Sequence, residues 1–202
     1  MSDIANLPTI RPTLEQIADD FSKDLSNLYE KIKIRVFLCG AGIDPEGGPP
    51  EGPPAKLVRY NIYNRLIQEG CETLLGEHEA LRRAAEGVLR AGFTLADFEL
   101  ELAEQKKTDL IIIFPSSEGS FAELGMFAIN DVIPMKMVVL IENNPIYFEG
   151  YVYQGPVMAA RNRRAHIEHC NYEDLDEVWS IIERHIQNQK VLKRGRKRGV
   201  EY

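Results

Sequence analysis

The sequence predicts an α/β fold: a doubly wound, mostly parallel sheet of about five strands, with an extra N-terminal helix. The main observation is a set of short apolar segments at residues 34–38, 110–114 and 137–141, of which the last two have no polar residue. Apolar runs of this length are typical of strands buried on both faces of a parallel sheet. The segments between them have helical periodicity, and strands that alternate with helices indicate a doubly wound sheet.

The composition predicts one compact domain with appended pieces. The chain has 202 residues, of which 44% are hydrophobic and 27% charged, and this is enough for one sizeable core. We divide it into an N-terminal helical extension (1–32), an α/β domain (33–189) and a basic C-terminal tail (190–202). The formal net charge of -7 argues against nonspecific nucleic-acid binding by the whole surface.

Cysteine usage and hydropathy predict a cytoplasmic protein. The three cysteines, Cys39, Cys71 and Cys170, are odd in number and irregularly spaced, which favours a reducing compartment over a disulfide framework. The N-terminal residues lack the basic start and apolar core of a signal peptide, and no apolar run is long enough to span a bilayer. We therefore expect neither secretion nor membrane insertion.

The first predicted element is an amphipathic helix. Thr13 and Gln16 have the spacing of a capping box. Its apolar residues recur at steps of three and four: Leu14, Ile17, Phe21, Leu25, Leu28 and Ile32. This face either covers the sheet or packs against another subunit, and the second alternative makes a homo-oligomer the expected state.

A glycine-containing turn follows the first predicted strand. Glycines at the carboxyl end of a strand let the backbone approach a ligand. Taken alone, Gly40 and Gly42 are a weak dinucleotide-binding signal, because Pro45 replaces the third glycine of G-x-G-x-x-G. The turn consists of Cys39, Gly40, Ala41 and Gly42.

Residues 44–55 are rich in proline and glycine and predict a long loop, which is either a lid over a site at this edge of the sheet or an insertion without a role. Beyond the loop we predict a helix at 56–69, a second strand at 71–75, and a helical segment at 78–107 with a break near Gly92. Either one of three glutamates in that segment supplies a second catalytic carboxylate, or all three belong to a solvated helix face: Glu99, Glu101 and Glu104.

The strongest functional signal lies in residues 109–128. A small polar loop follows the apolar strand at once and leads into a helix, and open α/β sheets bind ligands at such carboxyl ends. Ser120 and Glu123 fit the S-x-x-E capping box, in which the carboxylate serves only the helix end. In the first helical turn, beside free loop amides that attract anions, the same carboxylate could instead stabilise or attack a sugar whose glycosidic bond breaks. This context alone does not decide whether Glu123 is a structural cap or a catalytic group.

Two further elements follow the fourth predicted strand, which lies at residues 137–141. Residues 143–154 form a polar and aromatic loop, after which Gly155 and Pro156 predict the start of a helix with proline in its first turn. Arginines just beyond could pair with phosphate or with a partner: Arg161, Arg163 and Arg164.

The last strand and helix are predicted at the C-terminal end of the domain. His166 and His169 lie in a short strand at 165–170, and a strand points these positions to opposite faces, so we predict no metal site. The final helix has an apolar stripe that indicates core packing: Leu175, Val178, Trp179, Ile182 and Ile186.

The basic tail begins at Lys190. It carries six cations against the single acid Glu201, and Gly195 and Gly199 are expected to interrupt any helix there. The tail is either a solubilising segment or a docking arm for nucleic acid, in which each cation that meets a phosphate releases a counterion.

The segment GSFAELG (119–125) resembles the motif of nucleoside 2-deoxyribosyltransferases, in which a small loop precedes a glutamate that acts on the anomeric carbon. A closer resemblance is to the deoxyribosyltransferase-like toxins of bacterial retron anti-phage systems. Three blocks carry it: VFLCGAG (36–42), DLIIIFPSSEGSFAELGMFA (109–128) and YQGPV (153–157). This chain has Ser116 and Ser117 where the transferases place aspartates that hold the nucleobase.

The resemblance implies a Rossmann-like, deoxyribosyltransferase-like domain that cleaves an N-glycosidic bond, with Glu123 as the catalytic residue. It implies NAD or a related nucleotide as substrate, no cofactor, and a toxin restrained by a retron reverse transcriptase and its RNA-linked DNA. The alternatives are a nucleoside 2-deoxyribosyltransferase acting on deoxynucleosides and a non-catalytic nucleotide-sensing module. The expected substrate-binding residues are Cys39, Gly40, Ala41, Gly42, Pro115, Ser116, Ser117, Gly119, Ser120, Tyr153, Gln154 and Gly155.

Overall fold

The computed structural model describes residues 13–78, 81, 83, 86–87, 92, 94–144 and 150–197. Contacts along the chain define two compact units, residues 1–32 and 33–202. The first unit contains α1 (Leu14–Glu30), which begins at the predicted capping box. The Gln16 amide donates to Thr13 Oγ1 at 3.2 Å, and the Thr13 amide donates to Gln16 Oε1 at 2.9 Å.

The second unit is built on a five-stranded parallel sheet with the order β2-β1-β3-β4-β5. Each strand lies within a residue or two of its predicted position, and the predicted α/β fold class is confirmed. The order reverses between β1 and β3, which is the topological switch point where doubly wound folds bind ligands. The strands are β1 (Arg35–Cys39), β2 (Glu72–Leu74), β3 (Leu110–Ile113), β4 (Met137–Glu142) and β5 (His166–Cys170).

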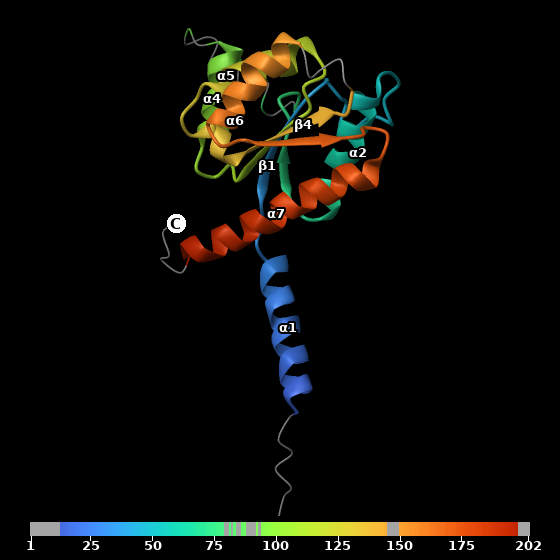
Figure 1. The fold of residues 1–202 in the computed structure, drawn as a ribbon, viewed down its shortest axis with the longest axis vertical. Helices are drawn as coiled ribbons and strands as arrows, with labels where there is room; N and C mark the ends of the chain where they lie inside the picture. The colour runs from blue at the N-terminus through green and yellow to red at the C-terminus, as the bar shows by residue number, and fades with distance from the viewer. Residues whose placement is uncertain are drawn as a thin grey trace, which may run out of the picture. The chain divides into compact units, whose positions relative to one another are not determined.

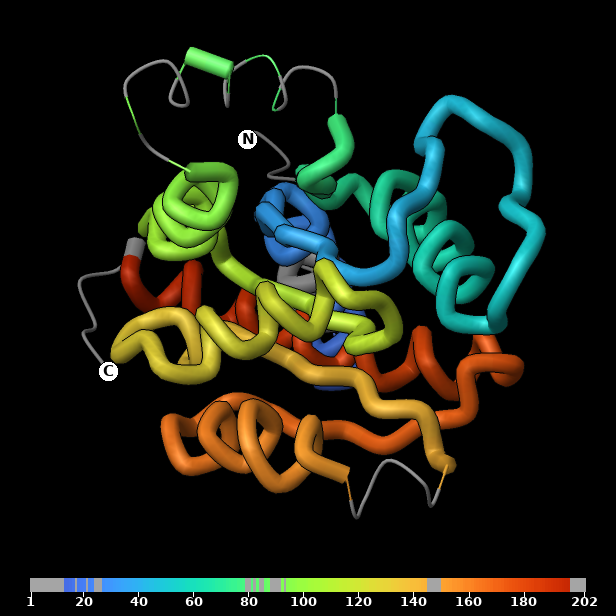
Figure 2. Tube along the Cα trace, turned by 90° about the horizontal axis from the view of Figure 1, so that it is seen from above, coloured from blue at the N-terminus to red at the C-terminus, as the bar shows by residue number. Residues whose placement is uncertain are grey.

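Helices cover both faces of the sheet (Figure 1). One layer holds α4 (Leu95–Glu104), α5 (Glu118–Ala128) and α6 (Met158–Asn162), whose apolar side chains share one buried cluster with alternate residues of β1, β3 and β4. The other layer holds α2 (Pro54–Gln68) and α7 (Leu175–Lys197), which contact each other. In Figure 2, α4 in green and α2 in teal lie well apart around the sheet. Because both faces are covered, every side chain of β3 is buried, which explains its unbroken apolar run.

The predicted break in the helical segment 78–107 is visible where the structure describes it. Gly92 has a φ of 89°, a value that glycine adopts readily. α4 then begins after Thr94, whose side chain accepts a hydrogen bond from the Asp97 amide at 3.2 Å. Residues 81, 83, 86 and 87 are helical, whereas the rest of the prediction between 79 and 93 falls largely outside the described residues.

The helix predicted to start at Gly155 begins earlier. Residues 151–152 are already helical, and a π-helical turn, η3 (Tyr153–Val157), leads directly into α6. Pro156 therefore lies inside a helix and not in its first turn. A proline removes a backbone donor, and a π-turn is one way in which a helix absorbs such an interruption.

α7 continues through residues that we predicted as a tail. The helix runs to Lys197, so the expectation that Gly195 interrupts it is wrong. Lys193 donates to Asp109 Oδ2 at 2.6 Å and to the Lys33 carbonyl at 2.9 Å. These bonds hold this end of α7 at the amino-terminal ends of β1 and β3. Tertiary contact thus outweighs the low helix propensity of glycine. Residues 198–202, including Gly199, lie outside the described residues.

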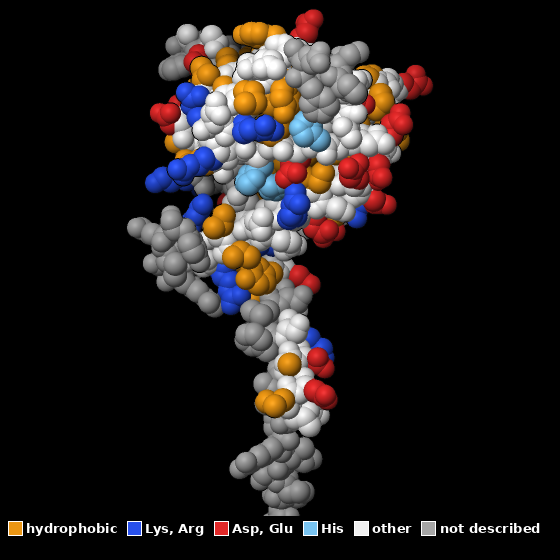
Figure 3. Space-filling model, viewed as in Figure 1, with side chains coloured by type: hydrophobic (Ala, Val, Ile, Leu, Met, Phe, Trp, Pro, Cys, Tyr) orange, Lys and Arg blue, Asp and Glu red, His pale blue; other side chains and the backbone are white. Residues whose placement is uncertain are grey.

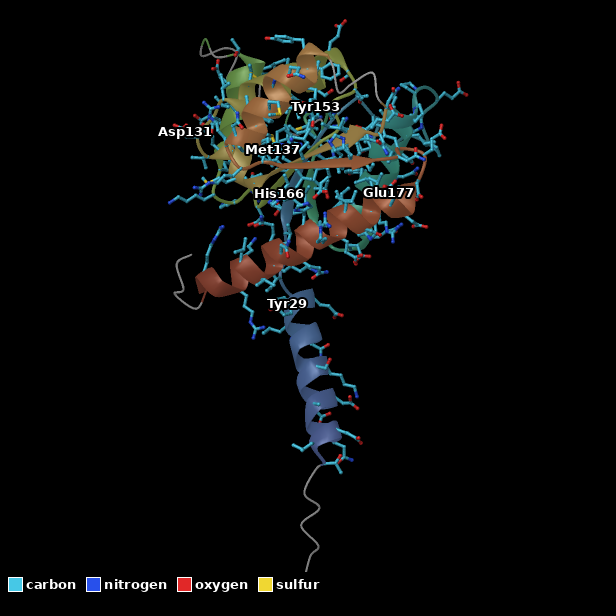
Figure 4. The ribbon with its side chains drawn as sticks, viewed as in Figure 1. Tyr29, Asp131, Met137, Tyr153, His166 and Glu177 are labelled. Atoms are coloured by element: carbon cyan, nitrogen blue, oxygen red, sulfur yellow. The ribbon has the colours of Figure 1, made fainter. Side chains whose placement is uncertain are left out.

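The two histidines of β5 point to opposite faces, as predicted. The His166 ring lies 4.6 Å from that of His185 on α7, and the His169 ring lies 6.0 Å from that of Tyr153. Figure 4 labels His166 and Tyr153. Within the described residues, no group of three or more His, Cys, Asp or Glu side chains is arranged to hold a metal ion. No helix in this part of the chain is both long and apolar enough to cross a membrane. The three cysteines are free and buried.

Candidate functional site

A cavity of about 450 Å³ lies where β1, β2 and β3 end, beside the topological switch point. Gly40 follows β1, Gly76 and Glu77 follow β2, and the start of α5 follows β3. α4 closes one side with apolar and acidic side chains. The described lining residues are Gly40, Arg59, Gly76, Glu77, Leu81, Glu86, Leu95, Phe98, Glu99, Leu102, Gly119, Ser120 and Glu123.

The start of α5 differs from the predicted capping box. Ser117 is the N-cap, and its side chain accepts a hydrogen bond from the Ser120 amide at 3.2 Å. Ser120 Oγ in turn accepts from the amides of Ser116 and Ser117, both at 2.9 Å. The box is therefore formed by Ser117 and Ser120, and Glu123 is not part of it. The capping interpretation of Glu123 is wrong because α5 begins at Glu118, which places Glu123 in the second turn.

This network also changes the expected role of the loop amides. We predicted unpaired amides that attract a phosphate or a ribose oxygen. The amides of Ser116, Ser117 and Ser120 are instead bonded to serine hydroxyls of the same loop. A ligand oxygen at these amides would have to replace a hydrogen bond that already exists.

Glu123 is half-buried, and its side chain lines the cavity. Burial, followed by the nearby carboxylates of Glu99 and Glu77, raises the pKa of Glu123 to about 8. Arg59 and a hydrogen bond with the Cys39 thiol lower this pKa and partly offset the increase. A carboxyl group with a pKa near 8 exchanges its proton in the physiological range, which is typical of catalytic groups.

Glu99 supplies a second carboxyl group to the same cavity. Burial, followed by the charge of Glu77, raises the pKa of Glu99 above its usual value. The other two candidates on this helix, Glu101 and Glu104, are exposed and do not line the cavity. Two carboxyl groups with different environments can divide the roles of proton donor and charged nucleophile or stabiliser.

Arg59 and Glu77 form an ion pair in the cavity wall. Arg59 is 1% exposed. Its Nη2 donates to Glu77 Oε2 at 3.0 Å, and its Nη1 donates to Glu77 Oε1. Sequence reasoning missed both residues. The available signal was the position of Arg59 at helical spacing with Ala55 and Ile62, which places a cation on the buried face of α2.

The structure divides the predicted site residues between two cavities. Gly40, Gly119, Ser120 and Glu123 line the larger one. A second cavity of about 100 Å³ lies at the ends of β3 and β4, on the other side of the β3–α5 loop. Its lining includes three of the predicted residues, Pro115, Ser116 and Tyr153. It also includes Pro53, at the end of the proline-rich loop, and the first two residues of α2.

The remaining predicted residues have other positions. Cys39 is buried below the larger cavity, where burial raises the pKa of its thiol. The Ala41 carbonyl accepts a hydrogen bond from Arg59 at 2.7 Å. A Cβ on Gly42 would lie 3.7 Å from Glu77 Oε1. The described linings of the two cavities do not include Ser117, Gln154 or Gly155, of which the last two lie in η3.

Two curated relatives from Escherichia coli match most of this chain. The "Retron Ec73 putative ribosyltransferase/DNA-binding protein" is 27% identical over 167 residues, which are 79% of this chain and 50% of that protein. The "Retron Ec86 putative ribosyltransferase/DNA-binding protein" is 25% identical over 150 residues, which are 73% of this chain and 44% of that protein. The chain thus spans about half the length of the curated relatives it matches.

A protein-family model described as "STM3845 retron effector protein" matches residues 91–199, which is more than half of the chain. The matched region contains Glu99, the whole of β3 and the loop into α5 with Glu123. This chain therefore belongs to the STM3845 retron effector protein family.

Proposed function

We propose that the protein cleaves the N-glycosidic bond of a nucleotide bound in the larger cavity, with Glu123 as nucleophile or as stabiliser of the oxocarbenium ion. The bond between the anomeric carbon and the base nitrogen breaks, and water adds to that carbon. The observation that carries the proposal is the placement of Glu123 and Glu99 in one cavity at the switch point of the sheet. The names of the Escherichia coli relatives, which include ribosyltransferase, support this class of chemistry.

The charge of the cavity favours NAD or a related nucleotide as the substrate. Four glutamates line it, and the described lining offers Arg59 as a cation. A nicotinamide ring bound to ribose carries a positive charge, which these carboxylates attract, and it leaves as a neutral base. Phosphate groups would be repelled from the same surface, so we place them outside the cavity.

Two alternatives remain on the same geometry. A nucleoside 2-deoxyribosyltransferase would accept a second base at the anomeric carbon in place of water. A nucleotide-sensing module would bind without turnover, and the high pKa of Glu123, which keeps the carboxyl protonated at neutral pH in the free protein, is compatible with it.

The test is to incubate the purified protein with NAD, ADP-ribose, nucleoside monophosphates and deoxynucleosides, and to measure released free base by chromatography. We expect nicotinamide release from NAD and no release from deoxynucleosides. Calorimetry on the Glu123→Gln variant, which removes the carboxylate but keeps the cavity, ranks the binding of the same compounds. Binding of deoxynucleosides alone would support the transferase, and binding of NAD without release would support the sensing module.

We further propose that the protein acts as an anti-phage toxin, with a retron reverse transcriptase and its RNA-linked DNA as partners. The basic end of α7 is the proposed contact, because Lys190, Lys193, Arg194 and Arg196 lie on the last turns of one helix. α7 begins with acidic residues, including Asp176 and Glu177. In Figure 3 acidic side chains gather on the right of this face, where α7 begins, and basic side chains lie mostly on the left.

Charge reversal on this end of α7 tests the proposed contact. Lys190→Glu and Arg196→Glu avoid Lys193, which the fold uses, and each is expected to weaken binding of the RNA-linked DNA about tenfold and to reduce the salt dependence of binding. Lys56→Glu, in the first turn of α2, is the matched control. Equal affinity and equal salt slope in all three variants and the unmodified protein would exclude this contact.

A further inference from the structure

Arg59 is buried, and its guanidinium group binds the backbone of β1 and of the turn that follows it. Its Nη2 donates to the Leu38 carbonyl at 2.7 Å, and its Nη1 donates to the Ala41 carbonyl at 2.7 Å. These carbonyls belong to β1 and to the turn that follows it. The guanidinium group of α2 therefore determines the course of the chain beside the cavity.

Gly40 shows how close this packing is. A Cβ at this position would lie 2.7 Å from Arg59 Cδ and 3.2 Å from Phe114 Cβ. The stem of a buried, four-fold bonded arginine cannot move aside as a flexible surface side chain would. The turn therefore requires glycine at position 40. Gly40 and Arg59 both line the cavity.

Glu77 extends the same connection to a second loop. It follows β2, and besides its two bonds with Arg59 it accepts a hydrogen bond from the Ile43 amide at 3.3 Å. The pair thus joins α2, the turn after β1 and the loop after β2. A buried charge is costly without a partner, so neither member of the pair can be removed without consequence for the other.

We propose that Arg59 and Glu77 are a positioning pair for the Glu123 site, which holds two walls of the cavity in register and keeps a fixed cation and a fixed anion beside the Glu123 carboxyl group. This inference rests on the proposed function, but the titration of Glu123 that tests it does not depend on turnover. Neither residue is assigned a covalent step. Both act through the shape and the charge of the cavity around Glu123.

The charges that face Glu123 predict opposite effects for the two members. Glu99 from α4 and Glu77 raise the pKa of Glu123, whereas Arg59 from α2 and the Cys39 hydrogen bond lower it. Removal of the Glu77 charge should therefore lower the pKa of Glu123, and removal of the Arg59 charge should raise it. If the pair had only a packing role, the two substitutions would not shift the pKa of Glu123 in opposite directions.

The experiment follows the titration of Glu123 by infrared spectroscopy of the ligand-free protein, in which the band lost in Glu123→Gln identifies this carboxyl group. We expect Glu77→Gln to lower the midpoint by about one pH unit and Arg59→Met to raise it by a similar amount. Arg59→Lys keeps the charge but not the four bonds, so its midpoint should change little while kcat for base release falls about tenfold or more. Glu72→Gln is the matched control, because it removes the carboxylate of another Arg–Glu pair at the start of β2.

The outcomes are distinguishable. If Glu77→Gln folds and leaves the midpoint where it is in the unmodified protein and in Glu72→Gln, the positioning pair is wrong. If Arg59→Met does not fold, the Glu77→Gln shift and the kcat of Arg59→Lys decide. If the unmodified protein releases no base while the midpoint shifts as expected, the proposed reaction fails but the positioning of Glu123 stands.

Discussion

Glu123→Gln is expected to lower kcat/KM for base release by at least about a thousandfold. Glutamine keeps the shape of the side chain but can neither carry the negative charge nor attack the anomeric carbon. The fold should remain, because Glu123 takes no part in the capping of α5, which Ser117 and Ser120 provide. The measurement is the initial rate of base release at matched concentrations of folded protein.

Glu118→Gln is the matched control for this change. Glu118 lies in the first turn of the same helix, is exposed and does not line the cavity, so its loss should leave the rate nearly unchanged. Full turnover by Glu123→Gln would show that another group carries the reaction. Equal loss in both variants would indicate a general effect on α5.

The stability of the protein should fall between about pH 5 and pH 8 through the titration of Glu123. The folded-state pKa of about 8 lies above the ordinary value of 4.5, so the folded protein holds a proton that the unfolded chain releases. The stabilisation is fully present below the ordinary value and is lost as the pH rises through the folded value. The expected loss is a few kcal/mol of unfolding free energy, reduced by whatever solvent reaches the side chain.

Urea unfolding of the unmodified protein and of Glu123→Gln, measured at pH 5, 7 and 9, tests this expectation. The difference between the two proteins isolates Glu123 from groups such as His185, whose pKa burial lowers. We expect the glutamine variant to become the more stable of the two as the pH rises. A difference that does not change with pH would show that the pKa of Glu123 is ordinary in the folded protein.

The sheet could be predicted from the sequence because its strands carry their own signal. β3 and β4 are covered on both faces, so they read as unbroken apolar runs with few alternatives. The position of Glu123 beyond the end of β3 follows from that strand and the helical spacing after it. Local patterns of this kind identify which edge of the sheet carries the site.

Features that depend on distant contacts could not be predicted in the same way. The pairing of Arg59 with Glu77 joins α2 to a loop after β2, and no spacing in the sequence indicates it. The extension of α7 past Gly195 depends on the contact of Lys193 with Asp109, 84 residues away. The start of α5 was misplaced because Ser117 and Ser120 offer two competing caps, and the hydrogen bonds of the folded loop select the first.

The pH dependence of kcat/KM for base release from NAD tests the role of Glu123 most directly, because this parameter reports the ionisation of the free enzyme. With the uncatalysed rate subtracted, we predict a rate that rises with pH, is half-maximal near pH 8 and levels off above it, since the reaction requires the ionised carboxylate. Glu123→Gln should show only a small residual rate without this rise. A rate that falls through pH 8, or a rise that persists in Glu123→Gln, would contradict the assignment of the reaction to this carboxylate.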